Sequence, residues 1–430
     1  MLPKVFFQLF FYLIPEGLTK MSKDFKYTVV IPSRNRQTYC ISAIKSVMLA
    51  KREDIEIIVL DNSLNANLLP KLIKANRLAE KVTLVRSEKK CLSMAENWER
   101  AIDLISGKWV MFIGDDDGCT QFTFDAFDFL TSTFKFSAFR WPLFYYKWPC
   151  FPSSNRGRLK LPLSIGKLNI FNSSDVLQAS SSWKGDRRWP AIGPSVYHGL
   201  VNAEIIRQGR DKYGKHFIGE AVDYASGILN ATLLDGYMRY SFPLTIMGAS
   251  GYSHTAALTG DQLKINGKSQ LEEFVYSAPV FDKALENTKL STPYVAYDFK
   301  ALFGKLGLDF ELTVEQFFES CIVDLSGVRN QAIFESEKVR LSAYAKELGL
   351  DQERLLSRTY QRFDTPLGPT GKGSKHYLTV DALSLGYGSI ERISELLPKM
   401  YAEYSWIKQN ELAMFENAII SKKLSARPWN

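Results

Sequence analysis

Three consecutive carboxylates, Asp115, Asp116 and Asp117, directly follow the apolar run 109–113. A buried strand of that composition would deliver concentrated negative charge to one point at its end, which costs free energy unless a cation neutralises it. Mg²⁺ and Mn²⁺ prefer hard oxygen ligands and are commonly shared between carboxylates and the phosphates of a substrate. The triplet therefore predicts a site where Mn²⁺ or Mg²⁺ holds a diphosphate. The alternative is a solvated acidic turn.

The chain before this triplet alternates between predicted strands and predicted helices. The strands are expected at 27–32, 55–61, 82–85 and 109–113, and the helices between them at 38–50, 67–79 and 92–104. Because the strands are continuously apolar, the pattern predicts a parallel sheet covered by helices on both faces. Ligands of such sheets bind beyond the carboxyl ends of the strands, where segments 32–36 and 61–63 also place polar residues.

In their order and spacing, these segments resemble the inverting family 2 glycosyltransferases. The segments that carry the resemblance are Val30-Ile31-Pro32-Ser33-Arg34-Asn35-Arg36, Val59-Leu60-Asp61-Asn62-Ser63 and the acidic triplet, approached by a helix and turn at 97–107. The resemblance covers about residues 26–251. It implies an α/β GT-A fold, a Rossmann-like and mainly parallel sheet flanked by helices. It also implies metal-dependent transfer of a sugar from a nucleotide diphosphate, with a UDP-sugar expected, in bacterial surface-polysaccharide synthesis such as that of capsule or lipopolysaccharide.

The resemblance implies donor-binding roles for the polar residues at the strand ends. Asp61, with Asn62 beside it, would recognise the base, because a carboxylate can accept a hydrogen bond from N3–H of uracil or thymine. The alternative for Asp61 is a helix N-cap. Arg86 is a further candidate for contact with phosphate or base, and a surface position explains it equally well. The first loop supplies the residues expected beside ribose and phosphate, where guanidinium groups suit phosphate geometry: Pro32, Arg34, Asn35 and Arg36.

The acidic triplet can be aligned with the family pattern D-x-D-D in two registers, because Gly114 stands where the first acid of that pattern could fall. Either register places one carboxylate, Asp115 or Asp116, near the ribose. Asp116 and Asp117 are the predicted metal ligands. His254 follows the predicted last strand of the domain and is a third candidate ligand, with a structural histidine as the alternative.

Inversion at an anomeric carbon needs a general base for the incoming hydroxyl and a metal that neutralises the leaving diphosphate. Segment 219–226 opens a helix expected at 221–234, where the resemblance implies an acidic catalytic motif. It points to Asp223 as the base, with Glu220 in reserve. The alternative for Asp223 is an acid favoured near a helix N-terminus by the helix dipole.

Three regions are predicted along the 430 residues: a leader at 1–21, a GT-A domain at 22–258 and a C-terminal α-helical domain at 259–430. The leader is either a misassigned start before Met21 or an interfacial anchor. Segment 139–189, rich in aromatic and basic residues, is expected to be a mobile lid of the acceptor site. Segment 368–374 resembles a P-loop only superficially and is expected to be a flexible loop. The amphipathic helices of the last domain are expected near 294–306, 314–323, 335–348 and 390–422.

Composition narrows the class of protein without deciding its substrate. The chain is 46% hydrophobic and 23% charged, as in ordinary globular proteins, and its net charge of +8 fits a polyanionic substrate, an anionic membrane or nucleic acid equally. Five scattered cysteines without a C-x-x-C pair argue against a disulfide framework and favour a reducing compartment.

We therefore expect a cytoplasmic enzyme, peripheral on the inner face of the cytoplasmic membrane, with a nucleotide-sugar donor and a glycan or lipid-linked glycan acceptor. Nucleic acid is not an expected partner, and the helical domain could pair two subunits. Two alternatives stay open. One is a sugar nucleotidyltransferase, which would normally carry a glycine-rich signature that residues 32–36 lack. The other is a catalytically inactive, GT-A-like protein that binds glycans or acts as a scaffold.

Overall fold

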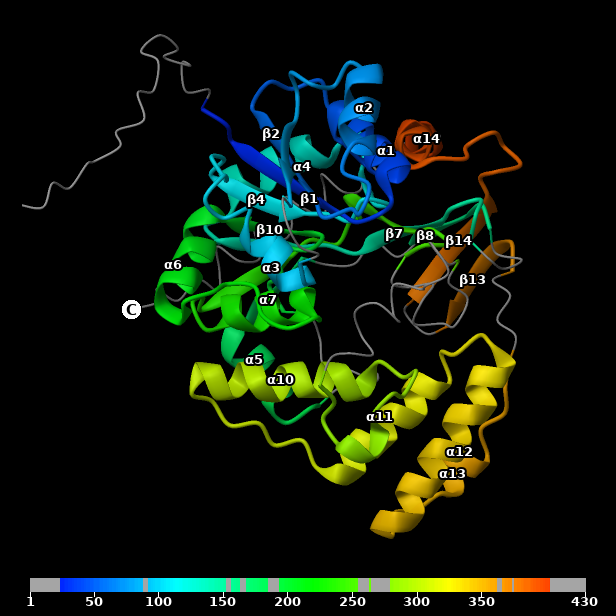
Figure 1. Ribbon diagram of the computed structural model, residues 1–430. Coiled ribbons are helices and arrows are strands. Elements are labelled where there is room, and N and C mark those ends of the chain that lie inside the picture. The colour runs from blue at the N-terminus through cyan, green and yellow to red at the C-terminus, as the bar shows by residue number, and fades with distance from the viewer. Residues whose placement is uncertain are drawn as a thin grey trace, which may run out of the picture.

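The computed structural model of the protein describes residues 24–87, 92–151, 156–162, 168–184, 193–253, 263, 279–361, 366–372 and 375–402. Two sheets and a helical region make up this part of the chain (Figure 1). The predicted leader at 1–21 and His254 lie outside the described residues. Among the helices of the described part, none combines the length and the apolar character that crossing a bilayer requires.

The first sheet has the strand order β3-β2-β1-β4-β10-β6-β11-β9. Its first four strands are parallel, as the sequence predicts, whereas β10 runs antiparallel to β4. The strands of this sheet are β1 (Tyr27–Ser33), β2 (Ile55–Asp61), β3 (Thr83–Arg86), β4 (Trp109–Phe112), β6 (Ala138–Arg140), β9 (Asn169–Asn172), β10 (Gly199–Asn202) and β11 (Gly236–Arg239). The helices around it are α1 (Gln37–Met48), α2 (Leu68–Ala75), α3 (Met94–Glu99), α4 (Thr123–Thr133), α5 (Ser173–Ser181), α6 (Ala203–Tyr213) and α7 (Val222–Ala231).

Both faces of the central strands are buried, which explains their uninterrupted apolar sequences. Successive side chains of a strand point to opposite faces of a sheet. Val29 and Met111 accordingly join the core beneath α1, α2 and α4, whereas Val30 and Phe112 join the core beneath α3, α6 and α7. Trp98 of α3 stacks on Phe112 with ring centroids 4.7 Å apart. The central strands of the sheet are therefore covered on both sides.

The second sheet lies where the sequence predicted a lid and a flexible loop, and both predictions are wrong for the described residues. Its order is β13-β14-β8-β7-β12-β5. Phe144 and Tyr146 of the expected lid are buried in its core, and residues 368–372 of the expected loop form a strand that pairs antiparallel with β14. The strands are β5 (Gly118–Cys119), β7 (Leu143–Lys147), β8 (Arg158–Pro162), β12 (Thr245–Ala249), β13 (Gly368–Lys372) and β14 (Lys375–Asp381).

The helical region, residues 279–361, is built around a core that also includes Trp183, Ala225 and Ile228 of the first part of the molecule. Short caps define its helices: Thr313 and Gln316 form a capping box at the start of α11, and Gly307 and Gly349 end α10 and α12 in the left-handed conformation. Phe299, Phe317 and Leu341 are among its buried residues. The region comprises a 3₁₀ turn η1 (Lys283–Leu285) and the helices α10 (Thr292–Leu306), α11 (Val314–Leu325), α12 (Gln331–Leu348) and α13 (Glu353–Leu356).

The chain then returns to the first part of the molecule, which differs from the predicted helical domain at 259–430. Strand β14 pairs with β8, and helix α14 (Ile390–Ala402) packs against α1 and β5. Ser394 of α14 donates a hydrogen bond to the carbonyl of Cys119 at 2.6 Å. Residues 366–402 therefore complete the domain that begins with β1, and the helical region is an insertion between β12 and β13.

Candidate active site

Polar side chains gather at the carboxyl ends of the parallel strands. Ser33, Asp61 and Arg86 are the last residues of β1, β2 and β3, and the strand register pairs Ser33 with Asp61 and Asp61 with Arg86. The acidic triplet follows β4, the other neighbour of β1. This edge of the sheet is the one at which the sequence predicted a ligand site, because parallel α/β sheets bind ligands beyond their carboxyl ends.

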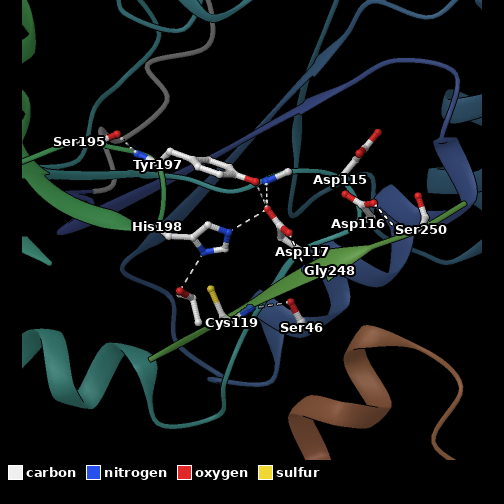
Figure 2. A network of polar contacts seen from close by, with 12 residues as sticks. Ser46, Asp115, Asp116, Asp117, Cys119, Ser195, Tyr197, His198, Gly248 and Ser250 are labelled. Carbon is white, nitrogen blue, oxygen red and sulfur yellow. Dashed lines mark hydrogen bonds and ion pairs between the residues drawn. The ribbon is translucent and has the colours of Figure 1, made fainter. Parts of the chain in front are cut away.

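Asp117 is buried and holds the turn together (Figure 2). Its Oδ1 accepts a hydrogen bond from the amide of Gly248 at 2.7 Å. Its Oδ2 accepts from the amide of Gly114 at 2.6 Å and from the hydroxyl of Tyr197 at 2.7 Å, and lies 3.0 Å from Nε2 of His198. Burial alone would raise the pKa of Asp117, but His198 and these donors outweigh it and lower the pKa.

This geometry leaves Asp117 little capacity for its predicted role as a metal ligand, because three protein groups contact Oδ2 and one amide donates to Oδ1. Instead, Asp117 ties the turn after β4 to the segment before β10 and to β12. His198 is oriented in turn by Thr245 of β12, whose hydroxyl lies 2.9 Å from Nδ1. The contacts come from residues about 80 and 130 positions away along the chain, so the sequence pattern around the triplet contained no sign of them.

Arg36 lies between the other two acids of the triplet. It forms ion pairs with Asp115 at 2.5 Å and with Asp116 at 3.1 Å. Asp115 also accepts from the hydroxyl of Ser33 at 2.8 Å, and Oδ2 of Asp116 accepts from the amide of Ser250 at 2.9 Å. Burial raises the pKa of Asp115 to about 7 in spite of Arg36, and it raises the pKa of Asp116 as well. The guanidinium thus supplies positive charge where the sequence predicted a divalent cation.

At this turn, the described residues could supply only a few ligands to a metal ion. Nowhere in the described part of the chain do three His, Cys, Asp or Glu side chains come together as a metal cluster. Oδ1 of Asp116, however, takes part in neither the Ser250 bond nor the ion pair with Arg36. Mg²⁺ commonly binds through one or two carboxylates and completes its shell with substrate phosphates and water. Asp116 can therefore serve as such a ligand, whereas a site made of all three acids does not fit.

Asp61 presents a buried acceptor at the end of β2. Its Oδ1 accepts from the amide of Ser63 at 3.0 Å. Its Oδ2 has no hydrogen bond among the described residues and lies 3.9 Å from Nε of Arg86, another buried group without one. Because a buried polar atom without a partner costs free energy, each such atom calls for an explanation. A ligand N–H at Asp61 Oδ2 would provide one.

Two predicted donor-binding residues hold the loops in place. Asn35 has a φ of 56° and donates its amide to the hydroxyl of Ser63, while its side chain accepts from the amide of Leu64. Asn62 exchanges two hydrogen bonds with the backbone of Leu92. These contacts connect the loops after β1 and β2 with the segment before α3. The side chains of Asn35 and Asn62 thus bind backbone groups of neighbouring loops.

Asp223 lies in the first turn of α7. Burial raises the pKa of its carboxyl, and backbone hydrogen bonds at the helix start, together with Arg140 and His198, oppose that rise. Since His198 also contacts Asp117, the structure brings the predicted base into the electrostatic surroundings of the acidic turn. Asp223 and the triplet are about 105 residues apart in the sequence, so only the fold could place them near one another.

Glu220, the reserve candidate, lies in the turn before α7. Burial raises its pKa to about 7, the carboxylate of Asp298 adds to that rise, and Arg34 opposes it. Arg34 is itself buried, so the loop after β1 and the turn before α7 approach each other. Pro32, by contrast, stays within β1 and offers only its ring and carbonyl.

Gly248 is a site residue whose importance the sequence did not reveal. A Cβ atom at this position would lie 1.6 Å from the backbone oxygen of Asp116. The same oxygen accepts a hydrogen bond from Nε1 of Trp148 at 2.9 Å. Glycine is therefore required for the close approach of β12 to the acidic turn. The only sequence signal was the glycine pair in Gly248-Ala249-Ser250-Gly251.

Residues 28–123 match the family model described as glycosyl transferase family 2. The solved structures similar to the chain include S. aureus TarS 1-349 in complex with UDP-GlcNAc, at 12% identity and a TM-score of 0.41, with 76% of this chain and 92% of that chain covered. Mannosyltransferase PcManGT from Pyrobaculum calidifontis in complex with GDP-Man and Mn²⁺ is another, at 13% identity and a TM-score of 0.38, with coverage of 77% and 85%. No curated protein matches the chain.

The sheet and the matched segment define the class of the protein, a glycosyltransferase with a Rossmann-like GT-A sheet. The matched segment is of the family 2 type. It runs from β1 to the first residue of α4 and includes Asp61, Arg86 and the whole acidic triplet. Asp223 and the helical region lie beyond it.

Proposed function

We propose that the protein transfers a sugar, with inversion, from a nucleoside diphosphate to a hydroxyl of a glycan or glycolipid acceptor. The observation that carries the proposal is the buried Oδ2 of Asp61, which lacks a hydrogen bond among the described residues. It lies at the same sheet edge as the acidic turn. An acceptor for a base and a charged turn for a diphosphate are the two features that a sugar-nucleotide site needs.

Uracil is a base that suits Asp61. Its N3–H is a donor that a carboxylate oxygen can accept, whereas N3 of cytosine is an acceptor. Arg86, the register partner of Asp61, adds a guanidinium beside the same pocket. A UDP-sugar is therefore the donor we propose.

The diphosphate would lie beside Arg36, Asp115 and Asp116. Arg36 is the cation already present at this turn and can form bidentate contacts with phosphate oxygens. Asp116 would hold Mn²⁺ or Mg²⁺, which when bound neutralises charge on the leaving diphosphate. Asp117 takes no part in this contact and keeps the turn in place through its hydrogen bonds to β12 and Tyr197.

Asp223 would act as the general base. Its carboxylate takes the proton of the acceptor hydroxyl while that oxygen forms a bond to the anomeric carbon and the bond from that carbon to the diphosphate breaks. Burial raises the pKa of Asp223, which makes the carboxylate a stronger base. Arg140 and His198 counter the rise, so that the charged form remains accessible.

The acceptor we propose is a growing bacterial surface polysaccharide or its lipid-linked precursor, reached in the cytoplasm at the inner face of the membrane. The net charge of +8 supports contact with an anionic membrane or an anionic glycan. We also propose that the helical region pairs two subunits.

Nucleotide binding and transfer can be tested separately. Calorimetry with UDP, with and without Mn²⁺, should show binding by the wild type. In Asp61→Asn, the side-chain oxygen would keep the place of Oδ1, because it accepts from the amide of Ser63. The new NH₂ group would then replace Oδ2 and face N3–H of the base. We expect about tenfold weaker UDP binding or more, corresponding to the loss of one hydrogen bond to a charged group. Asp125→Asn, an exposed acid of α4, is the control.

Asp223→Asn should bind UDP like the wild type and lose about 100-fold or more in kcat, the usual contribution of a general base. If the wild type binds no nucleotide, the donor site is wrongly placed. If it binds UDP but transfers no sugar to any hydroxyl acceptor and does not hydrolyse UDP-sugars, the inactive glycan-binding alternative gains support. Release of pyrophosphate from UTP and a sugar phosphate would instead identify a nucleotidyltransferase.

A further inference from the structure

Helix α10 of the helical region contacts helix α7, which carries Asp223 (Figure 1). The contact is polar at one point. Oδ2 of Asp298, on α10, accepts a hydrogen bond from the amide of Glu220 at 2.7 Å and another from the amide of Ala221 at 2.9 Å. Both amides belong to the turn that leads directly into α7.

The turn is shaped around this carboxylate. Gly219 has a φ of +73°, a conformation that side-chain-bearing residues rarely adopt. A Cβ atom on Gly219 would also lie 2.6 Å from the carboxyl carbon of Asp298 and 2.7 Å from both of its oxygens. Glycine is therefore needed for the backbone conformation and for the space that Asp298 occupies.

Asp298 supplies an acceptor at the start of α7, a helix that has no side-chain cap of its own. The first amides of a helix have no partner within the helix, and a side chain at the N-cap position usually provides one. The N-cap residue of α7 is Ala221, whose side chain cannot accept a hydrogen bond, and no side-chain cap is formed there. From 77 positions further along the chain, Asp298 instead binds the amide of Ala221 itself and that of Glu220 before it, and a negative charge at a helix N-terminus is favourable.

Other buried caps of the helical region act within the region itself. Asp324 of α11, for example, accepts from the amides of Ser291 and Thr292 at the start of α10. Asp298 differs because its two partners lie in the turn before α7, two residues or three from Asp223. The contact therefore links the helical region to the candidate catalytic residue.

We infer that Asp298 is a positioning residue, through which the helical region fixes the orientation of Asp223. The inference rests on the proposed role of Asp223 and adds a function for residues 279–361, which lie outside the matched family segment. Without the carboxylate, the turn 219–221 would lose both hydrogen bonds and the first turn of α7 would loosen. Misplacement of a catalytic group by about 1 Å can lower a rate by about 100-fold.

Two variants separate the hydrogen bonds from the charge. Asp298→Ala removes both acceptors, whereas Asp298→Asn keeps a carbonyl oxygen that can accept from the same two amides. Hydrogen exchange of the amides of Glu220 and Ala221 should become about tenfold faster or more in Asp298→Ala, because these amides lose their only described partner. In Asp298→Asn it should stay within about threefold of the wild type.

Turnover gives the second measurement. We expect kcat to fall about 10- to 100-fold in Asp298→Ala, with the dissociation constant of UDP unchanged and most of kcat restored in Asp298→Asn. The matched control is Asp324→Asn, a change at a buried cap of the same region that should alter stability but neither of these exchange rates nor kcat.

The outcomes distinguish this inference from the proposed function. If the wild type transfers no sugar, the proposed function fails, while the exchange rates still report whether Asp298 holds the turn. If the wild type is active and Asp298→Ala keeps both wild-type exchange and wild-type kcat, the inference is wrong. If Asp298→Ala does not fold, the kcat of Asp298→Asn is compared with that of Asp324→Asn. A fall in kcat for Asp298→Asn no larger than the fall for Asp324→Asn supports the inference, because Asp298→Asn retains the accepting oxygen. A larger fall in kcat for Asp298→Asn would overturn it.

Discussion

Removal of the Asp117 carboxylate tests whether this group is an internal hydrogen-bond acceptor, as the structure indicates, or a metal ligand, as the sequence predicted. The sequence predicted a metal ligand at this position, and the structure shows a carboxylate enclosed by protein donors. In a metal-free buffer, loss of a metal ligand would relieve repulsion among three acids and leave stability unchanged or higher. Loss of an internal acceptor would instead destabilise the fold. Asp117→Ala in EDTA therefore separates the two readings.

The expected loss follows from the groups left behind. Four donors face Asp117: two backbone amides, the hydroxyl of Tyr197 and the ring of His198. A water molecule in the space vacated by the carboxylate could satisfy two of them. Each remaining buried donor without a partner costs about 1–3 kcal/mol, so the free energy of unfolding should fall by about 2–6 kcal/mol.

Urea unfolding, followed by tryptophan fluorescence in EDTA, measures this change. The control is Asp125→Ala, whose side chain is 82% exposed and forms a long ion pair of 3.6 Å with Arg52; its effect should stay within about 0.5 kcal/mol. A loss of less than about 1 kcal/mol in Asp117→Ala would fall below the lower bound for one unsatisfied donor. That result would refute the internal role of Asp117 and return it to the candidate metal ligands.

Two further predictions concern stability. His216 is buried, neither ring nitrogen has a hydrogen bond among the described residues, and burial lowers its pKa to about 3. The unfolded chain binds this proton below about pH 6.5 and the folded protein does not, so His216 costs stability as the pH falls, about 2 kcal/mol between pH 7 and pH 5. His216→Leu should flatten urea-derived stability over that range, and an unchanged slope would contradict a neutral buried ring. Gly248→Ala should lower the unfolding temperature sharply or prevent folding, because its Cβ would overlap the backbone oxygen of Asp116. Gly304→Ala in α10, where a Cβ meets nothing within 4 Å, should instead be neutral or stabilising by up to about 1 kcal/mol, and similar melting curves for the two variants would disprove the close approach.

The sequence predicted the parallel half of the first sheet well. The bounds expected for the second strand, 55–61, are those of β2, and the three neighbouring strands differ by a residue or so at their ends. These strands are buried on both faces, so their continuous apolar runs are a strong local signal. Helices α10, α11 and α12 were also predicted, because caps and amphipathic patterns lie within each segment, whereas the short helix α13 was not predicted.

The second sheet was not predicted, because its pairing is remote. Strand β8 pairs with β14 more than 200 residues later, and β7 pairs with β12 about 100 residues later. The mixed aromatic and basic sequence around Trp148 does not indicate either partner strand. The same limit applies to the candidate site. Local patterns predicted that Asp61 and the triplet lie at one sheet edge. The partners of Asp117 and the acceptor at the start of α7, however, come from distant segments.

The place of α14 has a consequence for how the protein is made. Gly118, directly after the acidic triplet, lies against Ile390, and Cys119 accepts the hydrogen bond from Ser394. A ribosome synthesises these partners about 270 residues after the turn that they support. Tyr197 and Gly248, which bind Asp117, are synthesised well before residue 390. The turn therefore gains its last described packing partner only when the C-terminal residues emerge. A nascent chain halted before residue 390 would therefore lack this support.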